Sequence, residues 1–124
     1  MSVDALIPYA HVADVQRSID FYELLGLGVV NTHTDGGRLV WAFVMDPNEG
    51  ARLMLALAGP PVDPAQQAVL FYCWSPDVVA LRTGLAAAGV AVGAIEHPFY
   101  MPAGELRVSD PDGYVVLVGQ LSQA

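Results

Sequence analysis

Apolar and polar positions along the chain follow strand-like and helix-like periods, and the same order of periods occurs twice. The first half predicts five elements, namely strands at 6–12, 29–34, 38–45 and 52–58 and a helix at 15–25. The second half predicts strands at 69–75, 90–95, 105–109 and 114–120 and a helix at 78–88. We therefore predict an α+β fold of two tandem βαβββ modules, at 5–58 and 68–121. They form a single domain with a linker at 59–67.

Three pairs of landmark residues recur at an offset of 63, which predicts an internal repeat. The pairs are Asp14 and Asp77, Gly26 and Gly89, and Gly50 and Gly113. Each aspartate stands where a helix N-cap is expected, and each glycine of the second pair stands where a left-handed C′ residue ends a helix. The third pair closes two Asp-Pro turns that differ by one inserted residue.

Composition excludes several classes of function. The net charge is −8, with five arginines and no lysine, so the surface repels phosphate backbones and nucleic acid is not an expected partner. A single cysteine permits neither an internal disulfide nor a cysteine-based zinc site. The longest uncharged apolar run, residues 85–95, is too short to span a membrane, and no signal peptide is recognisable. A cytoplasmic location is expected.

The opening segment Tyr9-Ala-His-Val-Ala-Asp14 to Gly26 and the closing segment Asp110-Pro-Asp-Gly-Tyr114 resemble the vicinal oxygen chelate superfamily. This superfamily includes glyoxalases, extradiol dioxygenases, fosfomycin resistance enzymes and bleomycin resistance proteins. The resemblance covers nearly the whole chain and implies a curled mixed sheet with a central cavity. It is specific for the fold and not for one chemistry, so function has to come from the site.

The resemblance also locates where metal-using members hold their ligands, on the first and last strand of each module. The corresponding residues here are Ile7, Met54, Leu70 and Leu117. None of them is a ligand for a hard or borderline divalent cation, so the family's metal site is predicted to be absent and no cofactor is expected. A relocated site built from His33, Glu96, His97 and Glu105 has no recognisable ligand spacing.

Strand alternation predicts which side chains line the cavity. The expected ligand-binding residues are Tyr9, His11, Trp41, Phe43, Met54, Tyr72, Trp74, Tyr100, Met101, Glu105 and Arg107. Several have plainer interpretations. The aromatic residues also suit a core, His11 a structural histidine, and Glu105 with Arg107 a simple ion pair. Cys73 faces the helix by parity and is expected to be an inert thiol.

The segment 97–104 is unusual because two prolines bracket Phe99, Tyr100 and Met101. These side chains are expected to be buried, either as a lid over the cavity or against a partner chain.

The leading hypothesis is a metal-free small-molecule-binding protein of the bleomycin-resistance kind. It would be homodimeric and would sequester a cationic or aromatic compound, as in antibiotic resistance. One alternative is an enzyme without a metal, a lyase or isomerase in which His11 and Glu105 act as an acid and base. The other is a metal-dependent lyase or dioxygenase with displaced ligands.

Overall fold

The computed structural model of the protein describes residues 4–121 and has two compact units, divided between residues 62 and 63. The first contains β1 (Tyr9–Val12), α1 (Val15–Leu24), β2 (Gly28–Asp35), β3 (Arg38–Met45) and β4 (Arg52–Leu57). The second contains the 3-10 turn η1 (Pro64–Gln66), β5 (Leu70–Ser75), α2 (Val78–Ala87), β6 (Glu105–Ser109) and β7 (Val115–Gln120). The α+β fold class is confirmed.

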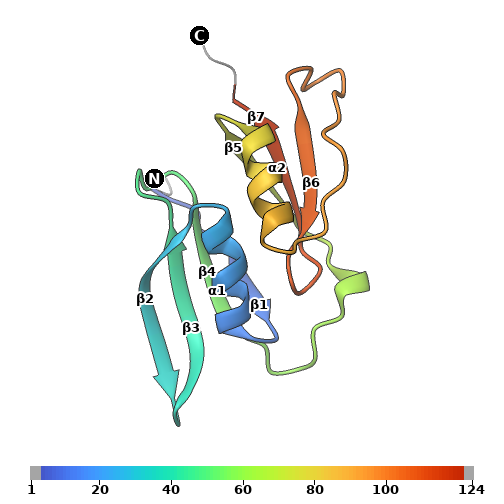
Figure 1. Ribbon diagram of the computed structural model, residues 1–124. Helices are drawn as coiled ribbons and strands as arrows, with labels where there is room; N and C mark the ends of the chain where they lie inside the picture. Colours follow the sequence, from blue (N-terminus) through green and yellow to red (C-terminus); the bar gives the residue numbers. More distant parts are fainter. Residues whose placement is uncertain (1–3, 122–124) are drawn as a thin grey trace. The chain divides into compact units, whose positions relative to one another are not determined.

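In the first unit α1 packs across one face of a four-stranded sheet of order β1-β4-β3-β2 (Figure 1). β1 runs parallel to β4, and the other neighbours are antiparallel. Alternate residues of the strands point toward the helix and are buried, among them Val12, Val44 and Leu55. They pack with the apolar stripe of α1, which includes Val15 and Ile19. Helix α1 does not cover the opposite face of the sheet.

In the second unit α2 packs on a three-stranded sheet of order β5-β7-β6, with β5 parallel to β7 (Figure 1). Leu106, Val116 and Val118 are buried on the helix side, together with Val78 and Leu85 of α2. The strand pairings of the two units correspond at an offset of 63 residues, because Tyr9 pairs with Met54 and Tyr72 pairs with Leu117.

Both helices begin at the predicted residues and end one residue before the predicted bounds, at Leu24 and Ala87. The carboxylate of Asp14 accepts the backbone N–H of Arg17, and that of Asp77 accepts the N–H of Ala80. Gly26 and Gly89 follow the helices with φ of 89° and 87°, the left-handed conformation that glycine adopts without strain. None of the helices within residues 4–121 is long and apolar enough to cross a membrane.

Two predicted strands differ from the structure. Residues 90–95 form no strand, and the only pairing beside them is an isolated bridge between Glu96 and Glu105. This segment is rich in alanine and glycine, which are poor strand formers, and the Gly93 carbonyl accepts a hydrogen bond from Arg82 Nε. The first strand begins at Tyr9 instead of residue 6, because Pro8 has no N–H to donate to a ladder.

The two Asp-Pro turns align differently from the predicted pairing of Gly50 with Gly113. The carbonyl of Asp46 accepts the N–H of Glu49, just as the carbonyl of Asp110 accepts the N–H of Gly113. Glu49 and Gly113 are also the left-handed residues of their turns, with φ of 63° and 85°. Gly50 is therefore the inserted residue.

Candidate functional site

The sheet of the first unit brings five predicted ligand-binding residues together on the face that points away from α1. Cross-strand pairing places Tyr9, Met54 and Phe43 in one row. The next row runs from His11 across Ala56 to Trp41. The rings of Tyr9 and His11 meet edge to face with centroids 5.9 Å apart. These side chains lie on the same face of the sheet, as the alternation of residues along the strands predicted.

The sheet of the second unit carries the other predicted strand residues in two rows on its corresponding face. One row contains Trp74, Gly119 and Glu105, and the other contains Tyr72, Leu117 and Arg107. The ring centroids of Tyr72 and Trp74 lie 5.4 Å apart. His11 belongs to the first unit and Glu105 to the second, so neither sheet holds the predicted acid and base together.

The carboxylate of Glu105 is a buried acidic group on the open face of the second unit's sheet. Its residue is 8% exposed, and both of its oxygens accept hydrogen bonds from phenols. Tyr72 Oη donates to Oε2 over 2.9 Å, and Tyr100 Oη donates to Oε1 over 2.9 Å. Partial burial, together with the hydrogen bond and negative charge of Glu105, raises the pKa of Tyr72 to about 12. The hydrogen bond to Glu105 also raises the pKa of Tyr100.

Gly119 makes room for this arrangement and was not among the predicted site residues. A Cβ at position 119 would lie 2.7 Å from Tyr72 Oη, 2.9 Å from Met101 Cε and 3.3 Å from Trp74 Cζ3. These distances are shorter than van der Waals contact, so only glycine leaves space for the three side chains in their observed positions. The sequence signal was a glycine inside the apolar strand β7, a place where glycine often marks a close approach of another group.

A cavity of about 390 Å³ opens beside the Glu105 carboxylate, wholly within the second unit. It is lined by Gly93, Ala94, Glu96, Tyr100, Glu105, Arg107 and Leu117. Arg107 is exposed, and among the residues that the structure describes its guanidinium makes no ion pair with Glu105, whose oxygens are occupied by the two phenols. The simple ion pair considered for these two residues is therefore not formed. The cavity contains two acidic groups and one basic group.

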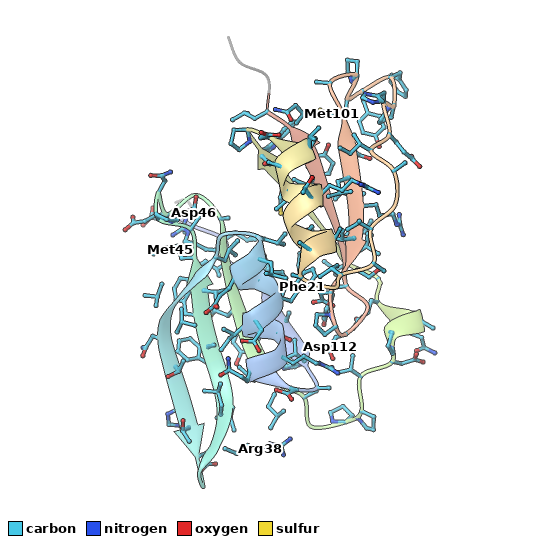
Figure 2. The ribbon with its side chains drawn as sticks, viewed as in Figure 1. Phe21, Arg38, Met45, Asp46, Met101 and Asp112 are labelled. Atoms are coloured by element: carbon cyan, nitrogen blue, oxygen red, sulfur yellow. The ribbon has the colours of Figure 1, made fainter. Side chains whose placement is uncertain are left out.

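The segment 97–104 is only partly buried within this chain, so its burial against a partner chain stays a prediction. Met101, labelled in Figure 2, is 7% exposed and packs above Gly119, but Phe99 is 95% exposed and Tyr100 is 55% exposed. A turn closed by Met101 N and the Pro98 carbonyl points Met101 toward the sheet and leaves Phe99 at its outer corner.

Burial raises the pKa of the Cys73 thiol, in keeping with the inert role expected of it.

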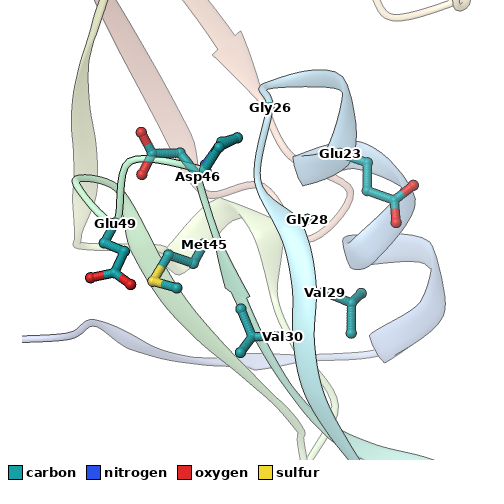
Figure 3. A pocket seen from close by; sticks show the side chains of 9 residues that line it. Glu23, Gly26, Gly28, Val29, Val30, Met45, Asp46 and Glu49 are labelled. Carbon is teal, nitrogen blue, oxygen red and sulfur yellow. The ribbon is translucent and has the colours of Figure 1, made fainter.

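A second cavity, of about 410 Å³, lies in the first unit between the end of α1, the start of β2 and the turn after β3 (Figure 3). Three carboxylates line it, those of Glu23, Asp46 and Glu49. Asp46 Oδ1 accepts the backbone N–H groups of Gly50 and Ala51, so this carboxylate stabilises its own turn. Nothing else in the cavity indicates a ligand.

The positions that correspond to metal ligands do not fit a divalent cation. Met54 and Leu117 lie on the open faces, Leu70 is the first residue of β5, and Ile7 precedes β1. Their side chains offer no oxygen or nitrogen donor. Within residues 4–121, no group of three His, Cys, Asp or Glu side chains is arranged to hold a metal ion. Of the residues considered for a relocated site, His33 lies in the first unit and Glu96, His97 and Glu105 lie in the second.

Comparison with known families is decisive for the fold. The sequence profile of the Glyoxalase/Bleomycin resistance protein/Dioxygenase superfamily matches residues 8–118, which span both units. The chain belongs to this superfamily. The superfamily match was expected from the opening and closing motifs, and that prediction is confirmed. No curated protein sequence matches the chain.

Several solved structures resemble this superfamily member over nearly its full length. TnmS3, an antibiotic binding protein from Streptomyces sp. CB03234, is 25% identical with a TM-score of 0.79, and the match covers 98% of this chain and 99% of that one. A bleomycin-binding protein complexed with bleomycin is 21% identical with a TM-score of 0.71, over 97% and 100% of the two chains. A bleomycin resistance determinant encoded on the transposon Tn5 is 21% identical with a TM-score of 0.73, over 98% and 100%. The latter two likenesses show the shared fold.

Proposed function

We propose that this chain is a small-molecule-binding protein that sequesters an aromatic organic compound carrying a positive charge, without a metal. The observation that carries the proposal is the buried Glu105 carboxylate, held by two tyrosines at the wall of the 390 Å³ cavity. A carboxylate with little access to water attracts an ammonium or guanidinium group strongly, since charge-assisted hydrogen bonds are the strongest that proteins make. Residues Tyr72 and Trp74 add aromatic faces for stacking and cation–π contact.

Similarity to proteins that bind antibiotics supports sequestration over catalysis. TnmS3 is an antibiotic binding protein, and a second similar structure contains bleomycin. A sequestering protein needs affinity alone, so the loss of donor side chains at Ile7, Met54, Leu70 and Leu117 is compatible with this role. Within the first unit we propose that the aromatic face, which carries Tyr9, His11, Trp41, Phe43 and Met54, also contributes ligand-binding residues.

The proposal is tested by titration calorimetry at pH 8 with 9-aminoacridine, a planar aromatic cation, and acridine, the same ring system without the charge. We expect one 9-aminoacridine per chain and at least about tenfold tighter binding than for acridine, because about 1.4 kcal/mol of charge-assisted hydrogen bonding corresponds to tenfold in affinity. The matched variant Glu105→Gln keeps the shape of the side chain and should remove the preference. Equal affinity for the two dyes would refute the cation site.

Two further measurements separate sequestration from the alternatives. Mass spectrometry of the recovered dye, and of bleomycin incubated with the protein, should show unchanged compounds. Conversion of either compound would favour an enzyme. Stoichiometric zinc, nickel, manganese or iron in protein purified without added metal would refute the metal-free part of the proposal.

We also propose that both units form one domain of duplicated origin, as the correspondence of their strand registers suggests. On the family resemblance we propose a homodimer in the cytoplasm. Light scattering during size-exclusion chromatography tests the dimer, which should weigh about twice the 13.2 kDa chain.

A further inference from the structure

Two tyrosines hold the same carboxylate, but their side chains are packed differently. Tyr72 lies on β5, which is paired with β7 along its whole length, and its hydroxyl rests over Gly119. Tyr100 lies in the loop before β6, is 55% exposed, and has one ring contact, an edge-to-face contact with the almost fully exposed Phe99. The side chain of Tyr100 is thus much freer to rotate than that of Tyr72.

The backbone around Tyr100 is fixed on both sides. Glu96 and Glu105 exchange two backbone hydrogen bonds of 3.0 and 2.8 Å, and Gln120 N donates to the Gly104 carbonyl over 2.8 Å. Met101, the next residue, is buried above the sheet. The loop therefore does not need to open for Tyr100 to release Glu105. Rotation of one exposed side chain is sufficient, and such rotations take picoseconds to nanoseconds.

The carboxylate needs its second donor only while no ligand is present. A buried charge without hydrogen-bond partners is costly, and Tyr100 supplies a partner to Oε1. Tyr100 and Glu105 both line the cavity, so a cationic group entering it reaches the same oxygen. Such a group is a stronger partner for a carboxylate than a neutral phenol.

We propose that Tyr100 is a side-chain gate. It occupies the cation subsite on Glu105 in the free protein and is displaced by the positively charged group of the ligand, whereas Tyr72 stays bound in both states. This inference rests on the proposed function, and it makes Tyr100 a residue that limits the affinity for a cationic ligand. A neutral ligand cannot replace the hydrogen bond between Tyr100 and Glu105, so it binds without displacing Tyr100.

The gate predicts that two chemically identical substitutions have different effects. Tyr100→Phe removes a hydrogen bond present only in the free protein, so 9-aminoacridine should bind about tenfold tighter, as expected for a hydrogen bond to a charged group. Tyr72→Phe removes a bond present in both states, so the affinity should change by less than about threefold. Acridine should not gain from Tyr100→Phe. Calorimetry of the three proteins with both dyes gives these numbers.

The binding measurements separate a failure of the proposed function from a failure of the gate. If wild-type protein does not prefer 9-aminoacridine over acridine, the proposed function fails and the gate with it. If that preference exists but Tyr100→Phe binds 9-aminoacridine no tighter than wild type, the gate alone is overturned. An independent check uses wild-type protein labelled with ¹³Cζ-tyrosine. On addition of 9-aminoacridine the Tyr100 signal should move to the position of a solvated phenol, while the Tyr72 signal keeps its hydrogen-bonded position. Movement of neither signal would also overturn the gate.

Discussion

Replacing Gly119 with alanine tests whether the close approach at this residue is what permits the Tyr72–Glu105 hydrogen bond. The strand backbone at Gly119 is not in the left-handed region, so alanine is conformationally acceptable there. The new methyl group would lie 2.7 Å from Tyr72 Oη. Because Tyr72 can move only by leaving Glu105, we expect the substitution to cost that hydrogen bond.

The expected magnitude combines two opposing terms. Alanine in a strand gains about 0.5–1 kcal/mol over glycine through the entropy of the unfolded chain. The lost hydrogen bond to a charged group costs about 1.5–3 kcal/mol, and the lower end applies because Tyr72 is 41% exposed. The free energy of unfolding should therefore fall by about 1 kcal/mol. Urea titration followed by tryptophan fluorescence measures it, since Trp74 lies beside Tyr72.

A double-mutant cycle with Tyr72→Phe isolates the cause. Without the hydroxyl there is no contact with its oxygen and no bond to lose, so the cost of Gly119→Ala should fall by a coupling energy of about 1.5 kcal/mol. The close contact of the new methyl group with Met101 Cε remains in both backgrounds. Gly84→Ala in α2, which meets no neighbour within 4 Å, is the matched control and should stabilise by about 0.5–1 kcal/mol. The same cost for Gly119→Ala in both backgrounds would refute the reasoning.

Three further predictions concern the turn, the phenol and the cavity. Gly113→Ala should lower the unfolding free energy by about 1–2 kcal/mol in urea titration, because Gly113 has φ of 85° and a Cβ there would lie 2.7 Å from Pro64 Cα. Gly50→Ala should change it by less than about 0.5 kcal/mol, and equal effects would contradict the turn alignment. The pKa of Tyr72 is raised from 10.0 to about 12, which favours the protonated phenol in the folded state, so its contribution to stability is complete below pH 10 and is lost as the pH rises to about 12. Absorbance titration of tyrosinate should lose its highest transition in Tyr72→Phe, and an unchanged titration would exclude this assignment. Arg107→Gln should tighten 9-aminoacridine binding about two- to fivefold, because it removes a positive charge from the cavity. Added salt should diminish this effect. Weaker binding would mean that Arg107 contacts the ligand favourably.

Local patterns were enough to predict most of the fold. The caps at Asp14 and Asp77 and the left-handed glycines 26 and 89 are decided by neighbouring backbone groups, so the sequence specifies them directly. Strand parity likewise put Tyr9, His11, Tyr72 and Trp74 on the face away from the helices. The strand at 90–95 was predicted wrongly because a local apolar pattern does not reveal that Arg82 binds the Gly93 carbonyl.

The sequence by itself determined the α+β class, the superfamily and the apolar character of the four metal-ligand positions, since each depends on residue type at a fixed spacing. Only the tertiary structure decided the chemistry around Glu105. Tyr72, Tyr100 and Gly119 are separated from one another by 19 to 47 residues in the chain, and no periodicity connects them. Strand pairing and one close approach over a glycine bring them to a single carboxylate. A buried charge is stabilised by the hydrogen-bond donors that lie next to it in the folded chain, and which donors these are depends on the tertiary structure.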